Sequence, residues 1–188
     1  TGGSGGSGGG SGSTGLDSGT EIPPNPDAVA RFDFDSGDAT DWLDTAAGNS
    51  LNPDDSLFSV SSVGSNPALK TSSNATNIHS HFVGDASNLS NFVITGRMAI
   101  DDAGAGVGVT AYSQYPSSDV YYRLRTMGAG NAFSISNHPD GCNGNASTGV
   151  QPSVDTWYEF ELSVSSEVSG NRVTAKVWRQ GDAKPGSP

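Results

Sequence analysis

The sequence predicts an all-β protein, built as an antiparallel sandwich of two sheets. Short segments alternate apolar and polar residues with a period of two, which is typical of strands with one buried face. Clusters of Gly, Asn, Asp, Ser and Pro separate these segments and favour turns. No convincing helical pattern occurs. About nine or ten short strands joined by such turns favour an antiparallel sandwich over a parallel sheet.

The expected strands follow one another along most of the chain. In order, they are residues 28–35, 57–63, 67–72, 91–100, 106–112, 120–125, 131–136, 157–165 and 172–180. Long polar stretches between them are expected to be loops, at residues 36–56, 73–91 and 137–155. Alternation directs Tyr158, Phe160, Leu162 and Val164 inward, together with Val173, Ala175 and Val177. On the outward face, Glu161 and Lys176 are expected to form a cross-strand pair.

The first 26 residues are expected to form a linker. Residues 1–20 are rich in Gly and Ser and cannot bury enough apolar surface to offset the entropy of ordering. The segment EIPPNPD then stiffens the chain before the fold begins. An expression linker is the alternative interpretation. The predicted domain is therefore residues 27–188, with further domains or a complementing chain as expected partners.

Charge and cysteine content narrow the class of partner. The formal net charge is −11, from nine Lys and Arg against twenty Asp and Glu. This balance disfavours nucleic acid and anionic membrane surfaces, and no apolar run is long enough for a membrane-spanning helix. Acidity suits Ca²⁺, although solubility alone also explains it. Cys142 is the only cysteine, so an internal disulfide is impossible.

The candidate ligand-binding site lies on residues 106–125, expected to form two neighbouring antiparallel strands. Their core face is expected to carry Val107, Val109, Tyr122 and Leu124. The outward face is expected to present rings and guanidinium groups that can stack on a sugar and bond its hydroxyls: Tyr112, Tyr121, Arg123 and Arg125, joined by Arg97. The alternative is that these side chains pair with the acidic surface or pack under a loop.

Three segments carry a family resemblance. The first is GVGVTAY followed by VYYRLR, the second is WYEFELSV, and the third is NRVTAKVWRQGDAKP. The resemblance depends on Trp157 in the second segment and on Trp178 and Gly181 in the third. The order of the segments resembles the laminin-G-like or concanavalin-A-like jelly roll of secreted bacterial carbohydrate-active proteins. The resemblance implies a sandwich that binds a polysaccharide or other glycan outside the cell or at its surface. It also implies closing strands that this sequence does not contain.

The same resemblance implies a structural Ca²⁺ near the first strand. The acidic side chains in that region are Asp33, Asp35, Asp38, Asp41 and Asp44, and the expected metal ligands are Asp33 and Asp35. The spacing is not that of an EF-hand loop, and Asp-rich loops also serve as turns. His79, His81 and His138 are expected to be single loop histidines, because zinc needs three or four converging ligands.

Catalytic signatures are missing from the sequence. Laminarinase-like glycosidases carry E-x-D-x-x-E, and alginate-lyase relatives carry R-x-E-L-R with Q-[IV]-H; neither occurs here. No catalytic residue is therefore assigned. The function predicted is a non-catalytic carbohydrate-binding module. Two alternatives remain open: a structural or adhesive sandwich with a protein partner, and a fragment of a polysaccharide lyase or glycoside hydrolase.

Overall fold

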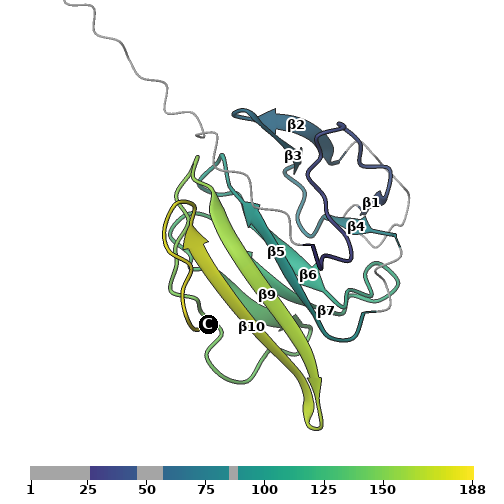
Figure 1. The fold of residues 1–188 in the computed structure, drawn as a ribbon, viewed down its shortest axis with the longest axis vertical. Helices are drawn as coiled ribbons and strands as arrows, with labels where there is room; N and C mark the ends of the chain where they lie inside the picture. Colours follow the sequence, from purple (N-terminus) through teal and green to yellow (C-terminus); the bar gives the residue numbers. More distant parts are fainter. Residues whose placement is uncertain (1–25, 46–56, 85–88) are drawn as a thin grey trace, which may run out of the picture.

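The structure, a computed structural model, describes residues 26–45, 57–84 and 89–188. Within these residues, all of the regular secondary structure is β-strand (Figure 1). All strand pairs are antiparallel, which confirms the predicted all-β class. The strands are β1 (Trp42–Thr45), β2 (Ser59–Val63), β3 (Asn66–Lys70), β4 (His79–Phe82), β5 (Phe92–Met98), β6 (Val107–Ala111), β7 (Tyr121–Thr126), β8 (Ser134–His138), β9 (Tyr158–Glu167) and β10 (Gly170–Arg179).

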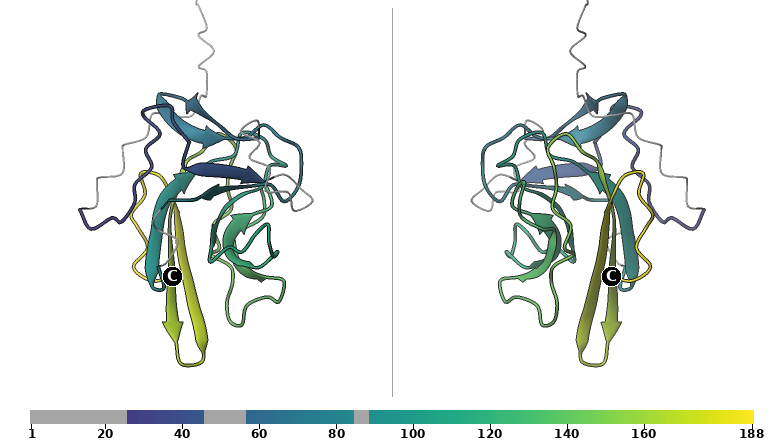
Figure 2. Two further views of the ribbon diagram at one scale, coloured as in Figure 1. Left: turned by 90° about the vertical axis from the view of Figure 1, so that its right-hand side faces the viewer. Right: turned by 90° about the vertical axis from the view of Figure 1, so that its left-hand side faces the viewer.

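Two three-stranded sheets form the body of the fold. One has the order β10-β9-β5 and the other the order β6-β7-β8. They lie face to face in a sandwich-like arrangement (Figure 2). Two smaller sheets, β1-β4 and β2-β3, lie together at the end opposite the β9–β10 hairpin tip (Figure 1).

The core lies between the two large sheets. On β9, Tyr158, Phe160, Leu162 and Val164 are buried and alternate with half-buried polar residues. Leu162 is fully buried and stands opposite Ile94 on β5 and Ala175 on β10. Leu124 and Phe133 reach the same core from the other sheet. The inward residues predicted for these strands are confirmed, because burying one face of a strand requires a period of two.

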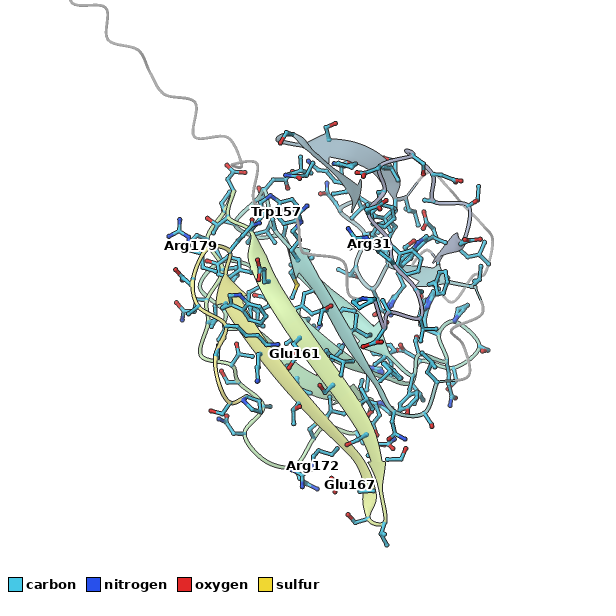
Figure 3. The ribbon with its side chains drawn as sticks, viewed as in Figure 1. Arg31, Trp157, Glu161, Glu167, Arg172 and Arg179 are labelled. Atoms are coloured by element: carbon cyan, nitrogen blue, oxygen red, sulfur yellow. The ribbon has the colours of Figure 1, made fainter. Side chains whose placement is uncertain are left out.

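The predicted pair on the outer face of the β9–β10 hairpin is also present. Lys176 stands opposite Glu161 in the strand register, with its Nζ 3.8 Å from Glu161 Oε1. Lys184 Nζ lies closer to Glu161, at 2.6 Å from Oε2, so the tail after β10 lies against this face. Glu161 is seen on β9 in Figure 3. Because these side chains remain in contact with solvent, such pairs contribute only about 0–1 kcal/mol.

The strand predicted over residues 28–35 is wrong. This segment has no strand, and Phe34 has φ of 59°, a left-handed conformation that interrupts an extended chain. The Asp35 N–H donates to Asp33 Oδ1 at 3.2 Å, which closes a local turn instead of a sheet bond. The strands β1 and β4 occur where loops were predicted, inside residues 36–56 and 73–91.

Nearly all of the predicted linker, residues 1–25, lies outside the described residues, so its role stays a prediction. Within the described ranges, no helix is long and apolar enough to cross a membrane.

Candidate functional site

Tyr121 is buried, with only 2% of its surface exposed. Strand alternation does direct it to the side of β7 away from Leu124, as predicted, but that side is covered. The Tyr121 ring stacks on His138, with centroids 5.3 Å apart, and packs near His79 at 5.2 Å. The expectation of an exposed ring is therefore wrong, because β4 lies over this face of the sheet.

Tyr112 and Arg97 do not join this face either. Tyr112 follows β6 with φ of 50°, which ends the alternation, and its ring packs against the core beside Phe92 at 5.3 Å. Arg97 lies on β5, which pairs with β9 in the other large sheet. Its guanidinium lies 5.3 Å from the Trp157 ring centroid and occupies the position in which a sugar would stack on this face of the ring. The single exposed patch predicted from sequence is not assembled.

Arg123 and Arg125 do share the outer face of β7, and both are half-buried. Arg123 Nε donates to Ser136 Oγ at 2.7 Å, and its Nη1 donates to the Tyr121 hydroxyl at 3.2 Å. Burial lowers the pKa of Arg125, and the positive charge of Arg123 lowers it further. Thus Tyr121, Arg123 and Arg125 lie together, but the aromatic ring is beneath the surface.

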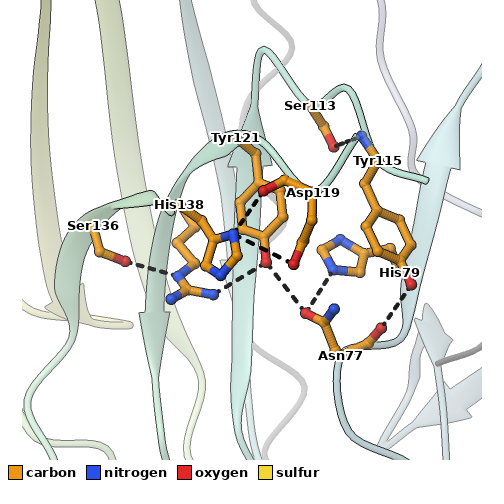
Figure 4. Close-up of polar contacts among 9 residues, drawn as sticks. Asn77, His79, Ser113, Tyr115, Asp119, Tyr121, Ser136 and His138 are labelled. Atoms are coloured by element: carbon orange, nitrogen blue, oxygen red, sulfur yellow. Dashed lines mark hydrogen bonds and ion pairs between the residues drawn. The ribbon is translucent and has the colours of Figure 1, made fainter. Parts of the chain in front are cut away.

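A cluster of histidines and tyrosines, which the sequence analysis did not predict, covers this face (Figure 4). His79 and His81 point to the same side of β4 and stack with their centroids 5.5 Å apart and their planes 5° apart. Tyr115 stacks on His79 at 4.4 Å. Asn77 Oδ1 accepts the Tyr121 hydroxyl at 3.2 Å. The alternation of His-Ser-His-Phe was the available signal, since it is itself a short strand pattern.

Both stacked histidines are neutral at neutral pH. The pKa of His79 is lowered to about 4. Burial is the largest cause, and the electrostatic effect of the nearby His81 is the second. Burial also lowers the pKa of His81, against the opposing effect of the Asp44 carboxylate. Burial raises the pKa of Tyr121, so its hydroxyl remains protonated. Neutral, mutually packed groups of this kind stabilise the junction between β4 and the β6-β7-β8 sheet.

We expect the histidine cluster to make stability depend on pH. The pKa of His79 in the folded state lies below its ordinary value of 6.5, so the unfolded state binds more protons between these values. Stability is therefore fully present above pH 6.5 and falls as the pH drops towards 4. After allowance for solvent screening, protonation of His79 lowers the free energy of unfolding by about 1 kcal/mol at pH 5.

Thermal unfolding at pH 7.5 and pH 5 measures this effect. The variant His79→Phe keeps a ring against Tyr115 but cannot take up a proton, so its melting temperature should fall less between the two values. Equal falls in the variant and the unaltered protein would show that His79 does not carry the dependence.

A groove opens near the tip of the β9–β10 hairpin, between the two large sheets and away from the histidine cluster. Its volume is about 520 Å³. The β9–β10 hairpin supplies one wall, including Glu167, Asn171 and Arg172, and Figure 3 shows Glu167 and Arg172 near the hairpin tip. The opposite wall comes from β7, β8 and the loop after β8, with Tyr122, Asn137, Cys142, Asn143 and Asn145.

Asparagine is the most frequent residue in the lining of this groove, at four positions. Asn171 Nδ2 donates to the Tyr122 hydroxyl at 3.3 Å, a contact that joins the two walls. Arg172 Nε donates to Glu167 Oε1 at 2.5 Å, so the positive and negative groups in the groove compensate each other. The lining therefore offers neutral donors and acceptors. Sequence reasoning missed it because the two walls are separated by long stretches of chain.

Asp33 and Asp35, the expected calcium ligands, contact the residues next to them. Asp33 Oδ2 lies 3.7 Å from Arg31 Nε, and its other oxygen accepts the Asp35 N–H. In the parts of the chain that the structure describes, no three His, Cys, Asp or Glu side chains gather as metal ligands. Calcium takes six to eight oxygens, so these residues alone do not fit it. Calcium binding stays a prediction without support from this arrangement.

Comparison with protein-family models, with curated proteins and with solved structures finds no match to this chain. The sandwich-like fold therefore rests on the strands described above. The resemblance to laminin-G-like jelly rolls stays a prediction.

Proposed function

We propose that the groove binds a carbohydrate chain and that this domain is a non-catalytic carbohydrate-binding module of a secreted protein. The amide-rich lining between the two sheets is the observation that supports the proposal. Four asparagines contribute to it, Asn137, Asn143, Asn145 and Asn171. A side-chain amide carries one acceptor oxygen and two donor hydrogens, which suits the paired hydroxyls of a sugar. Asn145 and Asn171 already use part of this capacity, because Asn145 Oδ1 accepts the Ser147 N–H and Asn171 bonds Tyr122 and Ser166.

The other groups in the groove favour a neutral polysaccharide. Tyr122 and Val173 supply apolar surface for the C–H groups of a sugar ring. Glu167 and Arg172 are already paired with each other, so neither offers an uncompensated charge to a ligand. The groove is thus mainly polar, with a small apolar part, as binding of a hydroxyl-rich ligand requires.

Affinity gel electrophoresis against a panel of neutral and acidic polysaccharides tests this proposal. A neutral polysaccharide should retard the protein, and Asn143→Ala should weaken binding roughly five- to tenfold through the loss of one or two hydrogen bonds. Asn74→Ala is the matched control, because Asn74 is also exposed but does not line the groove. Arg125→Ala tests the outer face predicted from sequence. Loss of binding in Arg125→Ala but not in Asn143→Ala would contradict the groove.

Cys142 provides a second, independent measurement. It is an exposed free thiol, it lines the groove, and it is the only cysteine of the chain. A bound oligosaccharide should therefore slow the reaction of this thiol with a maleimide, in proportion to occupancy of the groove. An unchanged labelling rate at concentrations that retard the protein in the gel would place the sugar elsewhere. No retardation by any polysaccharide would overturn the function itself.

A further inference from the structure

A second hollow lies at the opposite end of the molecule from the groove. Its volume is about 200 Å³, and it is lined by residues 31–34, 36 and 38–42. Arg31 lies at this end, far from Glu167 and Arg172 at the hairpin tip (Figure 3). One continuous segment forms the whole lining, so the hollow does not depend on the proposed carbohydrate site.

Aromatic rings form the apolar part of this hollow. Phe32 and Phe34 lie 5.1 Å and 6.0 Å from the Trp42 ring, measured between centroids. Phe82 of β4 packs against Phe32 at 4.5 Å and ties the segment to the fold. Phe32 nevertheless keeps 41% of its surface exposed. Part of this aromatic surface is therefore accessible to a ligand that enters the hollow.

Carboxylates surround these rings. Asp33, Asp38 and Asp41 line the hollow together with one cationic side chain, Arg31, so the lining carries a net charge of 1 − 3 = −2. We propose that this hollow binds a small organic cation, specifically a quaternary ammonium group. Ring faces attract cations that shed their water easily, and the carboxylates supply the complementary charge.

A metal ion suits this hollow less well than an organic cation. Calcium and magnesium require several oxygens directed at one point. In the described residues, no three His, Cys, Asp or Glu side chains gather in a group that could hold a metal ion. The Asp38 carboxylate accepts the Thr40 N–H at 2.8 Å, and Asp33 accepts the Asp35 N–H, so both take part in turns. They therefore act on a ligand through their charge and not through a coordination shell.

The other two tryptophans already form cation–π contacts with basic side chains of the same chain. Arg97 lies 5.3 Å from the Trp157 ring centroid, and Lys184 Nζ lies 5.8 Å from that of Trp178. Their ring faces are already in contact with a cation. They serve as internal controls, because an added ammonium ion should leave both rings unaffected.

Titration of the ¹⁵N-labelled protein with choline chloride, at constant ionic strength, tests the proposal. The chain has three tryptophans, and the indole N–H signal of Trp42, assigned with Trp42→Phe, should shift while those of Trp157 and Trp178 do not. The neutral isostere 3,3-dimethylbutanol should cause no shift. An equal response to both compounds would mean an apolar hollow without cation selectivity, and no response to choline would overturn the site.

Charge variants test the role of the carboxylates. The double variant Asp38→Asn and Asp41→Asn should weaken choline binding about fivefold, because an exposed charge attracts a bound cation only weakly in water. Asp182→Asn removes the same charge outside the hollow and should change nothing. Unchanged affinity in the double variant would contradict an electrostatic site. Glucosamine, a primary ammonium ion, should bind more weakly than choline, and the reverse order would overturn the assignment to a quaternary group.

Discussion

Replacing Tyr121 with alanine is expected to lower the free energy of unfolding by about 3–5 kcal/mol. Tyr121 is 2% exposed, and its ring packs against His138 and His79. Truncation leaves a cavity between β7 and β4 and removes a hydroxyl that Asn77 and Arg123 both contact. A surface residue of a sugar-binding patch would instead change stability by about 0.5 kcal/mol or less.

Urea unfolding followed by circular dichroism measures this difference. Tyr121→Phe is the matched variant, because it keeps the ring and removes only the hydroxyl; it should cost about 1 kcal/mol. If Tyr121→Ala were as stable as the unaltered protein, the ring could not be buried as described. Tyr121 would then be exposed beside Arg123 and Arg125, as the sequence predicts.

Replacing Asp44 with alanine is expected to cost about 2–4 kcal/mol, the second largest effect. Asp44 is 4% exposed, and its carboxylate accepts two hydrogen bonds. One comes from the Phe58 N–H at 2.9 Å and the other from the Ser80 hydroxyl at 2.6 Å. Removing the carboxylate leaves both donors without this acceptor in a largely dry environment, at the point where β1, β4 and the start of β2 meet.

Native-state hydrogen exchange locates the damage. In Asp44→Ala, amides of β1 and β4 should exchange faster, while those of β9 should change only with global stability. Asp44→Asn keeps the volume and one acceptor oxygen, so it should lose less stability than the alanine variant. Equal stability of all three proteins would show that the two hydrogen bonds do not hold this junction.

Local pattern was enough to predict most of the strands. The alternation in β9 and β10 identified the buried face correctly, down to the register that places Glu161 opposite Lys176. The antiparallel pairing of β6 with β7 was also correct. These features depend on neighbouring residues and on short turns, and both can be read from the chain.

The same reasoning failed where turn chemistry overrides the strand pattern. Phe32 and Phe34 alternate with Asp33 and Asp35 as strand residues do, but Asp33 bonds the backbone of its own turn. The two rings then pack on Trp42 in place of a sheet. The sequence predicts a loop around β4, because histidine and serine are polar and uncommon on the buried face of a strand. In the structure, His79 packs against Tyr115 and Tyr121.

By itself, then, the sequence determined the all-β class, the faces of the long strands and the acidic, single-cysteine character of the chain. Only the tertiary structure decided that Tyr121 is covered, that Arg97 belongs to the other sheet, and that a groove lies between β8 and the β9–β10 hairpin. The physical reason is that a period of two says which side a residue faces. It does not say which other segment covers that side, because that depends on contacts between residues far apart in the chain.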